Sequence, residues 1–171
     1  MRIVLASASP RRRELLEQAG IDFEILIGST RECITKEEPG EIVEELSLAK
    51  AKGVAEAVTG DAVIIGADTI VAKGNKVLGK PKDAEDAHQM LAMLQGEKHQ
   101  VYTGVTLLQK KGDEKIIRSF HERTDVFMTS MSDQEIEAYI ATGEPFDKAG
   151  SYGIQGRAGI FVVPDMAQSF G

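Results

Sequence analysis

The sequence predicts an α/β domain in which a mixed, twisted sheet is flanked by helices. Short apolar runs typical of buried strands alternate with helical patterns in the first half of the chain, and two long strand patterns joined by a short turn follow. The first arrangement favours parallel strands and the second an antiparallel pair, so we expect a mixed sheet. With 171 residues and 42% hydrophobic content, a single domain over residues 1–171 can bury its own core.

The first three predicted elements are a strand, a helix and a strand. Residues 3–6 are all apolar, as in a strand that is buried on both faces. Ser9 and Pro10 start a helix, because serine can cap free N–H groups and proline fits the first helical position. This helix ends at Gly20 and is expected to turn three side chains inward: Leu15, Leu16 and Ala19. A second strand is predicted over residues 23–27.

The next segments lead to an acidic residue. A polar loop over residues 28–40 is long enough to fold over a site, and a helix is predicted over residues 41–58. Residues 61–67 predict a central strand that ends at Asp68, and the pattern of residues 70–78 is typical of a hairpin.

The second half of the chain is predicted to contain two helices and three strands. Asp83 caps the first helix, whose apolar stripe consists of Ala87, Met90, Leu91 and Leu94. The other predicted elements are a hairpin of strands over 99–109 and 116–128, a helix from the capping box at 132–135 to Gly143, a glycine-rich loop over 143–156 and a strand over 159–163.

Composition and charge argue against several classes of protein. Twenty Lys and Arg against 27 Asp and Glu give a net charge of −7, which disfavours sequence-independent binding to a nucleic acid polymer or an anionic membrane. The apolar runs are far below the roughly 18 residues of a membrane-spanning helix, and the N-terminus lacks the apolar length of a signal peptide. Cys33 has no second cysteine to pair with, so we expect a cytoplasmic protein.

Residues 7–13, Ser-Ala-Ser-Pro-Arg-Arg-Arg, form the first candidate site. Backbone N–H groups at a helix start, serine hydroxyls and arginines converge there, as phosphate recognition requires. Each arginine opposes the helix dipole by about 0.3–1 kcal/mol, and a bound anion would reverse that cost. The alternative is a row of solvated surface arginines on an ordinary helix.

Two further candidates lie in the middle of the chain. Asp68, at the exit of the predicted central strand, can bind a divalent metal ion or activate water, or it can merely cap a turn. Lys80, in the segment GKPKD, can contact a phosphate or belong only to the turn before the next helix.

The glycine-rich loop over residues 143–156 is the last candidate. Glycines permit a close approach of backbone to ligand, although an exposed mobile loop would also contain them. The Gln155 amide both donates and accepts hydrogen bonds, which suits the edge of a base such as a pyrimidine.

Other kinds of site find no support. The three histidines His88, His99 and His121 lack metal-ligand spacing with one another and with Cys33, so we expect no zinc site. The sequence contains neither a GxGxxG nor a Walker A motif.

Five segments together resemble the Maf family of nucleoside triphosphate pyrophosphatases: SASPRRRELL, GADTIV, GKPKD, KHQVYTGV and GEPFDKAGSYGIQG. They stand in the family's order, and the likeness covers about residues 1–161. The resemblance implies hydrolysis of a nucleoside triphosphate to the monophosphate and pyrophosphate, with Mg²⁺ or Mn²⁺, as a house-cleaning activity. It also implies a fold similar to that of inosine triphosphatases, with a cleft between two lobes.

The resemblance assigns roles to individual residues. The family's catalytic aspartate, a proton acceptor, matches Asp68, and the implied metal ligands are Asp68 and Glu32. The pattern of the branch that acts on dTTP and UTP matches Arg11, Thr69 and Gln155. The positions that line the family's phosphate site match Ser9, Arg12, Lys50 and Lys80. Attack at the α-phosphorus requires charge neutralisation above all, which these cations and the metal ion would supply.

One segment departs from the family pattern and keeps other functions open. The family usually continues into a GLP-containing segment and a C-terminal helix, whereas this chain reads FVVPDMAQSFG, so we expect the domain to lack that segment after Val163. Such a change could spare binding while impairing catalysis, and the alternative function is a nucleotide-binding regulator of septum formation that does not depend on hydrolysis. Modified pyrimidine nucleotides are alternative substrates, and a homodimer is one alternative for the assembly.

Overall fold

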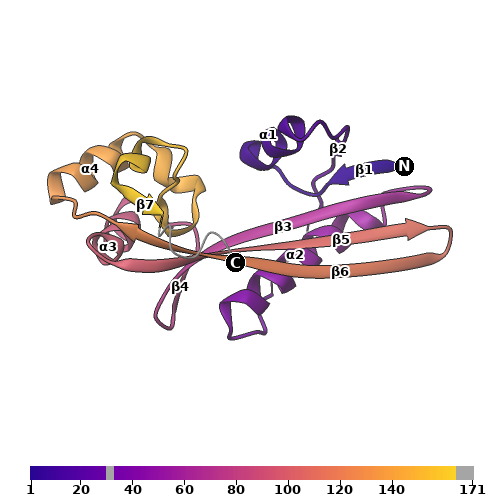
Figure 1. The fold of residues 1–171 in the computed structure, drawn as a ribbon, viewed down its shortest axis with the longest axis horizontal. Coiled ribbons are helices and arrows are strands. Elements are labelled where there is room, and N and C mark those ends of the chain that lie inside the picture. Colours follow the sequence, from indigo (N-terminus) through magenta and orange to yellow (C-terminus); the bar gives the residue numbers. More distant parts are fainter. Residues whose placement is uncertain (30–32, 165–171) are drawn as a thin grey trace. The chain divides into compact units, whose positions relative to one another are not determined.

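The protein has a mixed α/β fold (Figure 1), which the computed structural model describes for residues 1–29 and 33–164. Seven strands of this described part form one sheet: β1 (Arg2–Leu5), β2 (Glu24–Ile25), β3 (Ala62–Lys73), β4 (Lys76–Leu78), β5 (Lys98–Lys111), β6 (Glu114–Met128) and β7 (Val162–Pro164). Their order is β2-β1-β3-β5-β6-β7, with β4 paired to β3. β1 is parallel to β2 and β3, whereas β3–β4 and β6–β7 are antiparallel, so the predicted mixed sheet is confirmed.

Four α-helices accompany the sheet in the described residues: α1 (Pro10–Gln18), α2 (Pro39–Ala55), α3 (Ala84–Leu94) and α4 (Asp133–Ala141). Three 3-10 helices follow α4: η1 (Glu144–Asp147), η2 (Ala149–Ser151) and η3 (Arg157–Phe161). In the described ranges, none of the helices combines the length and the apolar character needed to cross a membrane.

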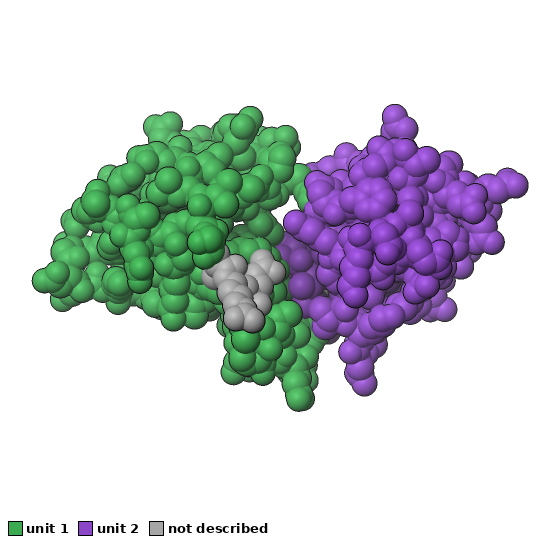
Figure 2. Space-filling view, turned by 180° about the vertical axis from the view of Figure 1, so that it is seen from behind, with its two compact units in different colours: residues 1–68, 103–122 green, residues 69–102, 123–171 purple. Residues whose placement is uncertain are grey.

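The chain divides into two compact units, which Figure 2 colours separately. Unit 1 comprises residues 1–68 and 103–122, and unit 2 comprises residues 69–102 and 123–171. Strands β3, β5 and β6 each contribute residues to both units. The predicted single domain and the predicted cleft between two lobes stay predictions. Glu32 and the segment from residue 165 onward, where a departure from the family's C-terminal pattern is predicted, lie outside the described residues.

Unit 1 is built around the packing of α2 against the sheet. Its buried apolar cluster contains Val4, Ala6, Ala51, Val54, Ala55, Val58, Ala62, Ile64 and Leu108. Two glycines let the helix come close: a Cβ atom at Gly66 of β3 would lie 2.2 Å from the Ser47 carbonyl oxygen, and one at Gly104 of β5 would lie 2.2 Å from the Val43 carbonyl oxygen. A larger residue at either position would push α2 away from the strands.

Unit 2 contains the second core, under α3 and α4. The predicted stripe of α3 is buried, at exposures of 8% or less for Ala87, Met90, Leu91 and Leu94. The Asp83 carboxylate accepts from the Asp86 N–H at 2.8 Å, and Ser132 and Glu135 form the complete capping box of α4. Both predicted helix starts are therefore confirmed.

The first helix differs from its prediction. It begins at Pro10 as expected, with Ser9 as N-cap residue, but the Ser9 side chain makes no capping hydrogen bond. No side chain of α1 is buried, and Leu15 is 56% exposed. The expectation that Leu15, Leu16 and Ala19 face a core was wrong, because a short helix dominated by charged residues carries too narrow an apolar stripe.

The central strand also differs. β3 does not end before Asp68 but continues to Lys73, so Asp68 lies inside a continuous strand rather than at its exit. The segment after Asp68 continues the strand because it pairs with β4 through the turn at Gly74, whose φ is +56°. The predicted hairpin is thus confirmed as an extension of the central strand. Near the C-terminus, residues 157–161 form η3 instead of a strand, and β7 starts only at Val162.

Candidate active site

An ion pair between α2 and β3 forms the centre of the candidate site in unit 1. Nζ of Lys50 donates to Oδ1 of Asp68, and these side chains are only 24% and 14% exposed. The close packing at Gly66 explains the pairing. Asp68 lies two residues after Gly66 and shares its face of the strand, while Lys50 lies one helical turn after Ser47, the residue that Gly66 approaches.

The start of α1 contributes a second cation. The Ser7 hydroxyl, which is buried, accepts from Nη1 of Arg12 at 3.0 Å and from the backbone N–H of Ser9 at 3.2 Å. Ser7 therefore holds the arginine back against the end of β1. Ser7 was predicted only as one of the serine hydroxyls that could recognise phosphate. Its contact with Arg12 was not predicted, although a serine directly after a buried strand is the signal that could have identified it.

Arg12 and Asp68 interact electrostatically. Burial is the main effect on Arg12 and lowers the pKa of its guanidinium, the negative charge of Asp68 raises this pKa, and the adjacent Arg11 lowers it. Two partly buried cations, Arg12 and Lys50, thus accompany one carboxylate. The cluster has a net positive charge, which suits an anionic ligand, and its carboxylate can accept a proton.

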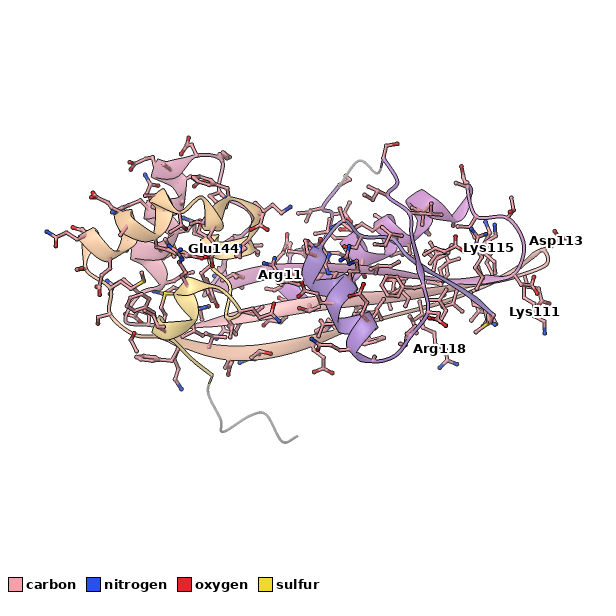
Figure 3. The ribbon with its side chains drawn as sticks, turned by 90° about the horizontal axis from the view of Figure 1, so that it is seen from above. Arg11, Lys111, Asp113, Lys115, Arg118 and Glu144 are labelled. Atoms are coloured by element: carbon pink, nitrogen blue, oxygen red, sulfur yellow. The ribbon has the colours of Figure 1, made fainter. Side chains whose placement is uncertain are left out.

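The three arginines of the motif have different surroundings. Arg11 lies in the first turn of α1 (Figure 3) and is partly buried, as is Arg12. Arg13 pairs with Glu17 one turn later at 3.2 Å, on the exposed side of the helix. The first turn of α1 contains no acidic residue. The free backbone N–H groups at this helix start carry partial positive charge, and together with the arginines they favour binding of an anion there.

Three further predicted site residues, Thr69, Lys80 and Gln155, belong to unit 2. Thr69 directly follows Asp68 in β3 and is partly buried, whereas Lys80 and Gln155 are exposed. Gln155 lies in a turn closed by a hydrogen bond from the Gly156 N–H to the Gly153 carbonyl, at 3.1 Å.

Gly150, in the glycine-rich loop, contacts the segments that carry Thr69 and Lys80. Its N–H donates to the Gly79 carbonyl at 3.0 Å, beside Lys80, and a Cβ atom at Gly150 would lie 2.8 Å from the side chain of Val71, two residues after Thr69. The structure therefore ties together, within unit 2, the three segments in which Thr69, Lys80 and Gln155 were predicted to act.

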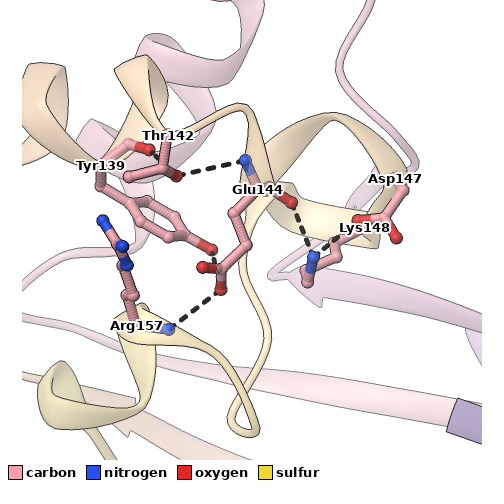
Figure 4. A network of polar contacts seen from close by, with 6 residues as sticks. All are labelled: Tyr139, Thr142, Glu144, Asp147, Lys148 and Arg157. Atoms are coloured by element: carbon pink, nitrogen blue, oxygen red, sulfur yellow. Dashed lines mark hydrogen bonds and ion pairs between the residues drawn. The ribbon is translucent and has the colours of Figure 1, made fainter.

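An open cavity of about 520 Å³ lies at the glycine-rich loop of unit 2 and is lined by Thr142, Gly143, Glu144, Asp147, Lys148 and Arg157. Figure 4 shows that several of its polar groups contact one another. Lys148 donates to the Glu144 carbonyl and the Asp147 carboxylate at 2.7 and 2.6 Å, and the Arg157 N–H donates to Oε1 of Glu144 at 3.0 Å. The lining contains none of the predicted site residues, so we interpret this network as one that shapes the loop.

The described residues offer a partial set of metal ligands. Within residues 1–29 and 33–164, no group of three or more His, Cys, Asp or Glu side chains is arranged to hold a metal ion. Mg²⁺ usually binds through one or two carboxylates together with water and substrate phosphates. Asp68 supplies one such carboxylate, and it is paired with the ammonium group of Lys50. This chemistry fits a divalent ion that arrives with its substrate, whereas Glu32, the second predicted ligand, lies outside the described residues.

Comparison with known proteins gives consistent matches along the chain. A family model described as "Maf-like protein" matches residues 2–170. A relative from Agathobacter rectalis, named dTTP/UTP pyrophosphatase, is 50% identical over 94% of this chain and 84% of its own length. One from Bacillus cytotoxicus with the same name is 49% identical over 94% of this chain and 82% of its own. A solved structure of the Staphylococcus aureus Ham1 protein aligns with 14% identity and a TM-score of 0.49, over 75% of this chain and 72% of that one.

Proposed function

The chain belongs to the Maf family, and from this membership we propose that it is a nucleoside triphosphate pyrophosphatase acting on dTTP and UTP. Relatives that are about half identical over 94% of the chain carry that name. The observation that supports the proposal most directly is the cluster of Lys50, Asp68 and Arg12, which combines a proton acceptor with two cations. The proposed substrates include modified pyrimidine nucleotides. The proposed role is house-cleaning of the cytoplasmic nucleotide pool. We expect no nucleic acid polymer as a partner.

The reaction is a displacement at the α-phosphorus. Asp68 accepts a proton from the attacking water, a bond forms between the water oxygen and the α-phosphorus, and the bond from that phosphorus to the bridging oxygen breaks, so pyrophosphate leaves. Arg12 and Lys50 bind phosphate oxygens and offset the charge that develops on them. Ser9 and Lys80 contribute further phosphate contacts, Ser9 from the start of α1.

A divalent ion would be held by Asp68 and Glu32, and when bound it would offset negative charge on the phosphates. Because Asp68 is paired with Lys50, we expect the apoprotein to keep its fold. Chelation by EDTA should therefore abolish pyrophosphate release without lowering the thermal midpoint by more than about 2 °C, and Mg²⁺ or Mn²⁺ should restore activity. Full turnover in EDTA would contradict the metal requirement.

We assign the choice between nucleotide substrates to Arg11, Thr69 and Gln155, which match the family's dTTP and UTP pattern. The Gln155 amide can pair with a carbonyl and an N–H on one edge of a base, which is the pattern that uracil and thymine present. Its exposure in a closed turn leaves the side chain available for such a contact.

A nucleotide panel tests the proposal. The protein should release pyrophosphate from dTTP and UTP at a kcat/KM roughly 10²-fold or more above that for CTP, because a wrongly paired polar edge costs a few kcal/mol. Gln155→Ala should reduce this preference, while Gln134→Ala, an exposed glutamine of α4, serves as the matched control. Failure of folded protein to release pyrophosphate from dTTP or UTP would refute the proposed function.

A further inference from the structure

A buried hydrogen bond connects the glycine-rich loop to strand β5. Nε2 of His99 and the hydroxyl of Tyr152 lie 2.5 Å apart, and the two residues are 0% and 6% exposed. Their rings pack edge to face, with centroids 5.4 Å apart and planes at 86°. A strand is a rigid support, so this contact fixes one point of the loop to the sheet.

Both partners are neutral at physiological pH. Burial lowers the pKa of His99 to about 4, with the charge of Lys73 acting in the same direction and the Glu97 backbone opposing it. Burial raises the pKa of Tyr152 well above its ordinary value, so the hydroxyl keeps its proton. The contact is thus a neutral hydrogen bond that persists across the physiological pH range, as a fixed anchor requires.

The backbone just before Tyr152 is also held in an unusual conformation. Gly150 and Ser151 have φ values of +67° and +66°, a region that serine rarely occupies. The fully buried Ser151 hydroxyl lies 3.2 Å from Sδ of Met90 in α3. Surrounding contacts must maintain such a conformation, and the Tyr152 anchor is the next one along the chain.

A second anchor lies on the other side of Gln155. Oε1 of Glu144 accepts from the Arg157 N–H at 3.0 Å. Between this point and Tyr152, the Gly156 N–H closes the turn onto Gly153 at 3.1 Å. The exposed Gln155 side chain therefore projects from a short turn that is fastened at both ends.

We propose that His99 and Tyr152 are positioning residues that hold the turn carrying Gln155 in the orientation needed to discriminate between bases. The inference rests on the proposed function, because it assumes that Gln155 contacts the base. Neither His99 nor Tyr152 is assigned a contact with substrate, so their substitution should affect discrimination between nucleotides more than the chemical step at Asp68.

Amide hydrogen exchange tests the anchor independently of activity. Tyr152→Phe keeps the ring and removes the hydroxyl, so the Gly156 N–H should exchange about tenfold faster than in the wild-type protein, the effect of losing one buried hydrogen bond. His99→Leu should have the same effect, whereas His99→Gln, which retains a polar group near the hydroxyl, should restore part of the protection. Unchanged Gly156 exchange in both Tyr152→Phe and His99→Leu would overturn the inference.

Tyr139→Phe is the matched control for loss of a buried tyrosine hydroxyl in the same unit. The Tyr139 hydroxyl reaches Oε1 of Glu144 only at 3.4 Å, at the weak end of hydrogen bonding, and Glu144 keeps its bond to the Arg157 N–H without it. We expect exchange at Gly156 to change less than twofold in this variant. If exchange at Gly156 were accelerated as much in Tyr139→Phe as in Tyr152→Phe, general destabilisation would explain the effect, and the inference would also be overturned.

Kinetics on the same proteins separate this inference from the proposed function. Tyr152→Phe should lower the ratio of kcat/KM for dTTP over CTP about tenfold, mainly through a higher KM for dTTP, with kcat changed less than threefold. If wild type releases no pyrophosphate from dTTP or UTP, the proposed function fails and the exchange result alone decides whether the pair holds the turn. If wild type and Gln155→Ala differ in selectivity but Tyr152→Phe matches wild type, the positioning role is refuted and the function stands.

Discussion

Asp68→Asn should lower kcat for dTTP hydrolysis on the order of 10³-fold, because the amide cannot accept the proton of the attacking water. The substitution preserves the shape of the side chain, and its partner Lys50 can still donate to the amide oxygen. We therefore expect a folded protein that binds nucleotide without turning it over. Pyrophosphate release under saturating dTTP measures the first effect, and calorimetric titration with dTTP measures the second.

Asp61→Asn is the matched control for this prediction. Asp61 is an exposed aspartate just before β3, and its Oδ1 accepts from the Gly112 N–H at 2.9 Å, a bond that the asparagine oxygen can also accept. Its kcat should stay within about twofold of wild type, as for surface changes away from a site. Wild-type turnover in Asp68→Asn would show that Asp68 is not the catalytic residue. The same variant tests the alternative function, because a regulator of septum formation that needs no hydrolysis would keep its cellular effect when hydrolysis is lost.

Gly66→Ala should destabilise unit 1 and disrupt the site at the same time. The new Cβ would lie 2.2 Å from the Ser47 carbonyl oxygen and 2.8 Å from the Ala51 nitrogen, both backbone atoms of α2 that cannot rotate away. Overpacking of this kind costs about 1–3 kcal/mol and forces the backbone to shift. We expect the free energy of unfolding in urea to fall by about 2–3 kcal/mol. Turnover of dTTP should fall as well, because α2 carries Lys50 away from Asp68.

Gly79→Ala provides the comparison for stability. No atom lies within 4 Å of the position that its Cβ would occupy, so the free energy of unfolding should change by less than about 0.5 kcal/mol. If Gly66→Ala were as stable as Gly79→Ala, close packing of α2 on β3 would not be the feature that places Lys50.

Elements with local signals were predicted well. Asp83 and the box of Ser132 and Glu135 mark helix starts because a side chain caps backbone groups only two or three residues away. The turn at Gly74 was evident for the same reason, since its positive φ favours glycine. Such interactions depend on neighbouring residues and therefore appear in the sequence itself.

Predictions that depended on distant partners were less accurate. Leu15 looked like a core residue, yet its side chain is 56% exposed in the part of the chain that the structure describes. Asp68 looked like the end of a strand, but the pairing of β3 with β4 carries the strand past it. In both cases the missing information was which other segment lies alongside.

The site shows the same division. The residues Ser9, Arg11, Arg12, Asp68, Lys80 and Gln155 could be selected from the sequence itself, whereas Thr69, Glu32 and Lys50 were assigned through the family resemblance. The contact of Lys50 with Asp68 spans 18 positions, and that of His99 with Tyr152 spans 53. Ser7 gained its role only when its hydroxyl was seen to accept from Arg12.

The sequence by itself determined the mixed α/β class, the caps of α3 and α4, the family and the residue types available for phosphate and base recognition. Tertiary structure alone decided which of those residues meet. Caps, turns and periodicity act over a few residues, whereas the Lys50–Asp68 ion pair exists because α2 packs at backbone distance over Gly66. The His99–Tyr152 anchor likewise exists because the glycine-rich loop folds back onto β5, and no local pattern encodes that return.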